Sequence, residues 1–313
     1  MATKPVELAV VMPVYNEEGA IEKVVRDWIR ALDALGIAFE IHAYDDGSRD
    51  RTAEILETLE RQDPRVRPHR KANSGHGPTI LSGYRANCDK PWLFQIDSDD
   101  EMKPEFFAPL WAARDDHDIL VGERDRIGQP WPRQIVSAVS RATVHALFGA
   151  AIHDVNAPYR LMRSAFFEPV FRAIPDDSFA PNLLVSGAAA ILGARTFTLP
   201  VPQTQRTTGE VSIRKWRLLK AAFRAFRQTI TGVARIRGLR PAFDGARASS
   251  PARGSHHRAP SLVPGLGLLL LASLVMNVIT ASDRDAVVEA ERATAKAERG
   301  VVSASLEVDP ESM

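Results

Sequence analysis

Two acidic residues separated by one position, Asp97 and Asp99, directly follow an apolar run over residues 92–96. Carboxylates at the end of a strand can both reach one divalent cation, because Mg²⁺ and Mn²⁺ take hard oxygen ligands and often bridge to phosphate oxygens. Glu101 lies two positions further along and could add a third oxygen. A cation held there would neutralise the charge of a departing diphosphate. An Asp-rich loop on its own is most often a capping turn, so this interpretation depends on what accompanies it.

Two other polar clusters precede this turn in the sequence, and each follows an apolar run. Residues 13–17 read Pro-Val-Tyr-Asn-Glu, and residues 45–50 read Asp-Asp-Gly-Ser-Arg-Asp. Carboxylates at two strand ends could hydrogen-bond a nucleobase and a ribose, while Gly47 would permit close approach of the backbone. The simpler alternative for the second cluster is a turn that caps the following helix.

Short apolar runs alternate with helical periodicity through the first two hundred residues. Strands are predicted over residues 8–14, 39–44, 66–69, 92–96, 118–122 and 196–201, and helices over residues 21–35, 51–62, 78–87, 104–114, 134–148 and 182–192. This order predicts an α/β fold of Rossmann-like type, with a mainly parallel sheet flanked by helices on both faces. Ligands in such sheets bind beyond the carboxyl ends of the strands, which is where the polar clusters fall.

The C-terminal third changes character after a predicted catalytic domain over residues 1–213. Residues 214–240 predict a basic amphipathic helix without any acidic residue, suited either to an anionic membrane surface or to packing on the core with a solvated basic face. Residues 241–260 have the composition of a linker. Residues 261–281 carry no charge and could just span a bilayer, form an interfacial hairpin or pack on the catalytic domain. Residues 282–313 form a charged tail.

Composition excludes several classes of function. The net charge of +1 argues against a nucleic-acid partner, and the single cysteine leaves no intrachain disulfide. No G-x-G-x-x-G turn follows the first predicted strand and no Walker A lysine motif occurs, which argues against a dinucleotide oxidoreductase and a P-loop enzyme. The histidines show no metal-ligand spacing, and only His76 lies in a glycine-rich segment. We expect no secretory leader, because Glu7 precedes the first apolar run and Pro13 interrupts it.

Taken in order, the three polar clusters resemble those of family 2 glycosyltransferases with the GT-A fold. The resemblance covers roughly residues 7–215, and within the family it is closest to dolichol-phosphate mannosyltransferases and bacterial polyprenyl-phosphate glycosyltransferases. Further segments are similar to the family pattern: the Asn-Ser-Gly-His-Gly run at 73–77 with Gly83, the Gly-Glu-Arg run at 122–124, and residues 154–161.

The resemblance implies roles for individual residues. The residues expected to bind the donor nucleotide are Pro13, Tyr15, Glu17, Asp46 and Asp97, with Lys215 or Arg206 assisting the diphosphate. Those expected to hold Mg²⁺ or Mn²⁺ are Asp97, Asp99 and Glu101, although Glu101 stands where this branch usually has Gln. Those expected to place an acceptor phosphate are Arg124, Arg133 and Ser137, with Arg126 as a substitute for Arg124.

The acceptor phosphate that the resemblance implies makes particular demands on the site because of its charge. A phosphate monoester has a second pKa of about 6, so at neutral pH it is already a nucleophile and needs cations rather than a general base. The function that the resemblance implies is inverting transfer of a hexose from GDP-mannose or UDP-glucose to a polyprenyl or dolichyl phosphate. The expected location is the cytoplasmic face of a membrane, as a peripheral or single-span protein, since Arg253, His256, His257 and Arg258 precede the apolar segment. A hydroxyl acceptor on a cell-surface glycan and a non-catalytic membrane adaptor remain the alternatives.

Overall fold

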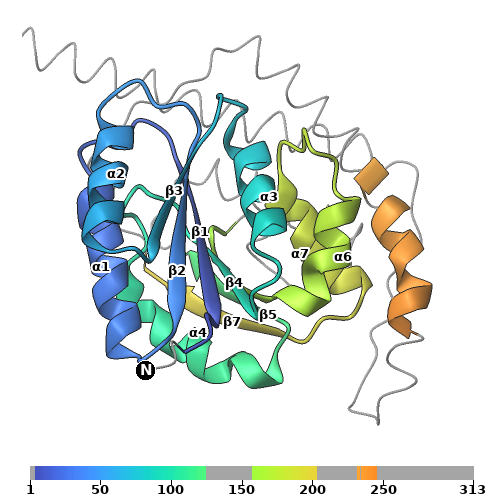
Figure 1. Ribbon diagram of the computed structural model, residues 1–313. Helices are drawn as coiled ribbons and strands as arrows, with labels where there is room; N and C mark the ends of the chain where they lie inside the picture. Colours follow the sequence, from blue (N-terminus) through green and yellow to red (C-terminus); the bar gives the residue numbers. More distant parts are fainter. Residues whose placement is uncertain (1–3, 125–156, 203–230, 233, 245–313) are drawn as a thin grey trace, which may run out of the picture.

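A single twisted sheet forms the centre of the molecule (Figure 1). The computed structural model describes residues 4–124, 157–202, 231–232 and 234–244 of the chain. Within these residues the strand order is β3-β2-β1-β4-β6-β5-β7. The strands are β1 (Leu8–Val14), β2 (Phe39–Asp45), β3 (Val66–Arg70), β4 (Trp92–Gln95), β5 (Ile119–Arg124), β6 (Tyr159–Arg163) and β7 (Thr196–Val201). All pairings are parallel except those of β6, which is antiparallel to both β4 and β5. The predicted mainly parallel α/β sheet is confirmed.

Helices cover both faces of this sheet, as the alternating sequence predicts (Figure 1). The helices are α1 (Ile21–Ala34), α2 (Thr52–Gln62), α3 (His76–Ala86), α4 (Phe107–Ala113), α6 (Ser164–Ala173) and α7 (Pro181–Ile191). Buried side chains of α1, α2 and α4 pack in one core, and those of α3, α6 and α7 pack in the other. Strand β1 lies between the two cores and is buried along its whole length, which explains why its sequence is a continuous apolar run.

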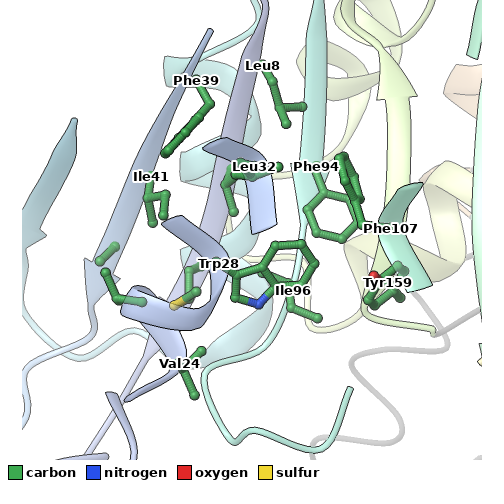
Figure 2. Close-up of a cluster of buried hydrophobic side chains, with 14 of the residues drawn as sticks. Leu8, Val24, Trp28, Leu32, Phe39, Ile41, Phe94, Ile96, Phe107 and Tyr159 are labelled. Carbon is green, nitrogen blue, oxygen red and sulfur yellow. The ribbon is translucent and has the colours of Figure 1, made fainter. Parts of the chain in front are cut away.

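The core beneath α1 is built around one tryptophan (Figure 2). The Trp28 ring is 1% exposed and lies 5.1 Å from the ring of Phe94, 5.7 Å from that of Phe107 and 5.8 Å from that of Tyr159, measured between centroids. Tilted and edge-on aromatic contacts of this kind each add about 0.5–1.5 kcal/mol beyond the burial of area. They fix α1 and α4 against β4 and β6, since Phe94, Phe107 and Tyr159 belong to β4, α4 and β6.

Three elements differ from the sequence prediction. Strand β6 and helix α6 were not expected, and the predicted helix over residues 104–114 is α4 flanked by 3-10 turns at Pro104–Phe106 and Arg114–Asp116. Arg160 interrupts the apolar pattern of β6 although its side chain is fully buried, and Pro169 lies inside α6, where proline normally argues against a helix. The predicted helix over residues 134–148 lies outside the described residues.

A helical segment at 231–232 and 234–244 lies against α6 and α7, coloured orange in Figure 1. Ile236 is fully buried, and the Phe243 ring lies 5.0 Å from that of Phe166. Arg235 and Arg240 are exposed. This part of the predicted basic helix therefore packs on the core with its basic face in solvent. Among the described helices, none is both long and apolar enough to cross a bilayer. Residues 214–230, most of the linker, the 261–281 segment and the tail fall outside the described residues.

A histidine pair at the edge of the sheet predicts acid sensitivity. His42 of β2 lies with Nδ1 2.9 Å from Nε2 of His69 on β3, and Glu40 Oε2 lies 3.3 Å from His42 Nε2. Burial, followed by the charge of His69, lowers the pKa of His42 to about 4, although Glu40 opposes the shift and Lys90 adds to it. Burial also lowers the pKa of His69. The unfolded chain therefore binds protons that the folded protein does not.

We expect the free energy of unfolding to be fully retained above about pH 6.5. It should fall as the pH drops from about 6.5 to about 4, because the unfolded chain takes up protons on His42 and His69 that the folded protein does not. Urea unfolding at several pH values checks this. His42→Gln should show a shallower loss over the same window, and an unchanged slope in this variant would contradict the assignment.

Candidate active site

The three polar clusters meet at one edge of the sheet. Strands β1, β2 and β4 are parallel neighbours, with Val14 level with Asp45 and Val11 level with Gln95. Their carboxyl ends therefore open on the same side, and the turns that follow them face one another. The sequence clusters at 13–17, 45–50 and 97–99 are brought together in space by this register.

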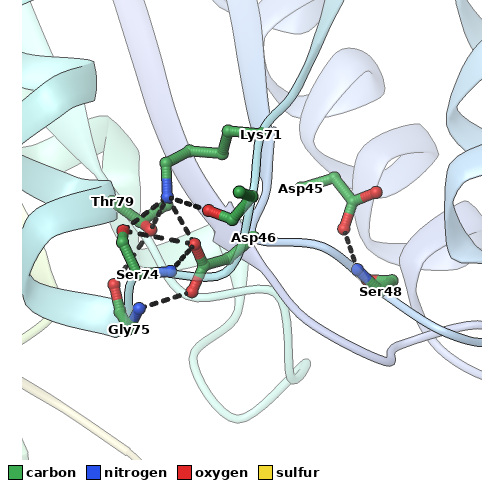
Figure 3. Close-up of polar contacts among 8 residues, drawn as sticks. Asp45, Asp46, Ser48, Lys71, Ser74, Gly75 and Thr79 are labelled. Carbon is green, nitrogen blue, oxygen red and sulfur yellow. Dashed lines mark hydrogen bonds and ion pairs between the residues drawn. The ribbon is translucent and has the colours of Figure 1, made fainter.

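The turns after β1 and β2 are tied to each other by hydrogen bonds. The backbone N–H of Asn16 donates to Ser48 Oγ at 3.0 Å, and the backbone N–H of Glu17 donates to Thr52 Oγ1 at 2.9 Å. Asp45 Oδ1 accepts from the Ser48 N–H at 2.8 Å (Figure 3). Much of the second cluster thus braces the two loops and closes a turn, as in the simpler interpretation of its sequence. The predicted cap is not seen, because the N-cap residue of α2 is Arg51 and makes no side-chain capping hydrogen bond.

Asp46 points away from this brace toward the start of α3 (Figure 3). It is 4% exposed and accepts hydrogen bonds from the N–H groups of Ser74 at 2.9 Å and Gly75 at 2.8 Å, and its carboxylate pairs with the Lys71 ammonium. Burial acts to raise the pKa of Asp46, but the Lys71 hydrogen bond and the backbone donors outweigh it and the pKa is lowered. Asp46 therefore stays ionised at neutral pH and holds the glycine-rich loop.

The same loop carries the lysine that the sequence did not single out. Lys71 Nζ also donates to Ser74 Oγ at 2.5 Å, Thr79 Oγ1 at 3.1 Å and the Ala72 carbonyl at 3.1 Å. Lys71 directly follows β3, so its position at a strand's carboxyl end is the signal that could have identified it. The ammonium has three protons and already faces four acceptors, so Lys71 serves to fix Asp46 and the loop before α3.

The acidic turn after β4 contains residues with different environments. Asp97 Oδ1 accepts from Gln95 Nε2 at 2.9 Å and lies 3.6 Å from His76 Nε2 at the start of α3. Asp99 Oδ1 accepts from the Glu101 N–H at 3.2 Å. Asp100 adopts a φ of 61° and pairs with Lys23 and Lys103. Burial acts to raise the pKa of Asp100, but these two lysines lower it on balance.

The donor set at this turn fits a hard divalent cation, although it is smaller than predicted. Within the described part of the chain, no three His, Cys, Asp or Glu side chains come together to hold a metal ion, so Asp97, Asp99 and Glu101 do not form a three-ligand cluster. Magnesium is commonly bound by one or two carboxylates, with substrate phosphates and waters completing the shell. Asp97 and Asp99 supply such oxygens, and a ligand role for Glu101 stays a prediction.

The remaining predicted residues are distributed as follows. Pro13 is buried near the end of β1, Tyr15 is half-buried just beyond it, and Glu17 is 4% exposed. Arg124 is the last residue of β5, half-buried and level with Val201 of β7. The predicted residues Arg126, Arg133, Ser137, Arg206 and Lys215 lie outside the described residues, so their roles stay predictions.

The chain is similar in sequence to proteins of one family. The family model described as "Glycosyl transferase family 2" matches residues 9–171. The undecaprenyl-phosphate 4-deoxy-4-formamido-L-arabinose transferase of Pseudomonas paraeruginosa is 32% identical over 232 residues, covering 71% of this chain and 65% of that protein. The protein of the same name from Edwardsiella ictaluri is 29% identical over 206 residues, covering 65% of this chain and 62% of its own length. The chain thus spans somewhat less than two thirds of these relatives.

Two solved structures share the fold. A glucosyl-3-phosphoglycerate synthase from Mycobacterium tuberculosis, in complex with Mn²⁺, UDP-glucose and phosphoglyceric acid, aligns with a TM-score of 0.52 at 16% identity, covering 74% of this chain and 80% of that one. A mannosyltransferase from Pyrobaculum calidifontis, in complex with GDP-mannose and Mn²⁺, aligns with a TM-score of 0.50 at 15% identity, covering 88% and 87%. At this level of identity the likeness concerns the fold.

Proposed function

Because the chain belongs to glycosyl transferase family 2, we propose that it transfers a sugar from a nucleotide sugar to a polyprenyl phosphate at a membrane surface. The observation that carries the proposal is the meeting of Asp46, Asp97 and Asp99 at one carboxyl edge of the sheet. The names of the relatives, which specify undecaprenyl phosphate, support the acceptor class.

The donor would bind along this edge. Asp46, held in place by Lys71, would lie beside the base, while Tyr15 and Glu17 would line the nucleotide at the end of β1. Asp97 and Asp99 would hold Mg²⁺ or Mn²⁺. Such a cation, when bound, supplies positive charge to the departing nucleoside diphosphate.

The acceptor needs placing rather than activating. An ionised phosphate attacks the anomeric carbon without a general base, so the protein's task is to bring the two reactants together in line. We assign this placement to cationic side chains, with Arg124 at the end of β5 as the described candidate and Arg133 with Ser137 as further candidates. A single in-line displacement inverts the anomeric configuration.

The proposal is tested by incubating the protein and Mn²⁺ with labelled sugar nucleotides and undecaprenyl phosphate, followed by extraction into an organic phase. The donor panel contains UDP-glucose, GDP-mannose and nucleotide-activated 4-deoxy-4-formamido-L-arabinose. We expect one donor to label the lipid phase. Undecaprenol, which has the same chain without the phosphate, should accept nothing. Label on undecaprenol or on a soluble glycan alone would identify a hydroxyl acceptor and reject the proposal.

A further inference from the structure

Behind the acidic turn lies a chain of buried polar side chains that the mechanism above does not use. Gln95, the last residue of β4, is fully buried, and its Nε2 donates to Asp97 Oδ1 at 2.9 Å. Its Oε1 accepts from Asn182 Nδ2 of α7 at 3.0 Å. Asn182 Oδ1 in turn accepts from the Tyr84 hydroxyl of α3 at 2.8 Å. Residues of β4, α7 and α3 are therefore linked in one chain of hydrogen bonds that ends at Asp97 Oδ1.

The hydrogen bonds of this chain all run toward Asp97, and the Tyr84 hydroxyl also reaches Gln95 Oε1 directly at 3.4 Å. An ionised carboxylate can only accept, so the Gln95 amide must present its nitrogen to Asp97 and its oxygen to Asn182. Asn182 must then donate to Gln95 and accept from Tyr84. Burial raises the pKa of the Tyr84 phenol; the charge of Asp97 adds to this shift and the charge of Arg160 opposes it. The phenol therefore keeps its proton and remains a hydrogen-bond donor. Aligned donors polarise one another in a low-dielectric interior.

The chain is also fixed at its middle member, Asn182. The fully buried Arg160 of β6 donates from one guanidinium nitrogen to the Asn182 carbonyl at 3.1 Å and to Ser186 Oγ at 3.3 Å. Its other nitrogens donate to the Ala157 carbonyl at 2.9 and 2.8 Å. The backbone of Asn182 is thereby held in place, and its amide has little freedom to turn away from Gln95.

We propose that Gln95, supported by Asn182 and Tyr84, is a positioning residue that locks the Asp97 carboxylate with Oδ1 turned inward and Oδ2 turned toward the cation and nucleotide. The inference rests on the proposed nucleotide-sugar donor site but not on the identity of the acceptor. Partners of this kind, hydrogen-bonded to a metal-binding carboxylate, typically change metal affinity or activity by about 10–100-fold when removed.

The test measures the affinity for UDP and for GDP by calorimetry, with and without Mn²⁺. Gln95→Leu should weaken Mn²⁺-dependent binding by about 10–100-fold. Asn87→Leu is the matched control, because Asn87 is a buried amide on the same side of the sheet that bonds the Tyr44 hydroxyl and the Gly83 carbonyl, each at 2.9 Å, and not Asp97. We expect this control to lose a similar amount of thermal stability while its nucleotide affinity stays within about 3-fold of the wild type.

Comparing single and double variants tests whether Asn182 affects nucleotide binding through Gln95 or independently of it. If Asn182 acts through Gln95, adding Asn182→Leu to Gln95→Leu should weaken binding by less than about 2-fold more. Full additivity, equal losses in Gln95→Leu and Asn87→Leu, or a wild-type protein that binds neither nucleotide with Mn²⁺ would each overturn the inference. If the binding losses are non-additive as expected but the protein transfers no sugar to undecaprenyl phosphate, the inference about Gln95 stands and the proposed acceptor is rejected.

Discussion

Replacing Asp99 by Asn is expected to lower the kcat of sugar transfer by about 100- to 1000-fold while leaving the melting temperature nearly unchanged. The amide keeps the shape of the carboxylate but removes the negative charge that holds a divalent cation. Losing several kcal/mol of charge stabilisation in the transition state corresponds to a rate loss of this size. Initial rates measured at saturating donor over a range of Mn²⁺ concentrations check the result, and the Mn²⁺ concentration for half-maximal rate should rise.

The adjacent carboxylate provides the control. Asp100 pairs with Lys23 and Lys103, and its φ of 61° is one that Asn tolerates well. Asp100→Asn should therefore lose only about 0–1 kcal/mol of stability and keep its rate within about 3-fold of the wild type. Similar rate losses in both variants would show that general negative charge at the turn matters, and would contradict a specific cation role for Asp99.

The edge of the sheet where the site lies could be predicted because it depends on local pattern alone. Buried parallel strands are continuous apolar runs, and the residue that follows each run marks its carboxyl end. The turns after β1, β2 and β4 could therefore be located to within a residue or two. Strand β6 could not be predicted, because the buried Arg160 breaks its apolar pattern, and its guanidinium is bonded by groups distant in the sequence, among them the Asn182 backbone carbonyl and the Ser186 hydroxyl.

The roles of individual acidic residues are harder to read from sequence. Asp45 and Asp46 are adjacent and chemically identical, yet one closes a turn on Ser48 and the other holds the loop before α3. A turn-forming carboxylate and a ligand-binding carboxylate have the same sequence signature. The support for Asp97 was missed for another reason. Asn182 lies 87 positions from Gln95 along the chain, and only the docking of α7 on the sheet brings their amides together.

Replacing Gly77 by Ala is expected to lower both stability and nucleotide affinity. A Cβ at this position would lie 2.4 Å from the carbonyl oxygens of both Ser178 and Phe179, which are backbone atoms that cannot rotate away. Overpacking of this kind costs about 1–3 kcal/mol, whereas the gain in helix propensity on going from Gly to Ala is at most about 1 kcal/mol. The clash should prevail. Urea denaturation is expected to show a loss of about 1–2 kcal/mol, and Gly238→Ala, whose added Cβ would meet nothing within 4 Å, should instead gain stability.

The loss of nucleotide affinity follows from what the first turn of α3 carries. The segment that contains Gly77 also supplies the Ser74 and Gly75 N–H groups that bond Asp46, and the His76 ring beside Asp97. Relief of the clash requires this segment to move away from the 178–179 backbone, so two of the proposed donor-binding carboxylates should lose partners together. We expect the affinity for UDP or GDP with Mn²⁺ to fall by at least about 10-fold, since a displacement of about 1 Å can cost a hundredfold in a preorganised site. If Gly77→Ala loses stability but keeps its nucleotide affinity, the position of α3 is not needed for binding. Asp46 and Asp97 would then still bind the nucleotide after α3 has moved.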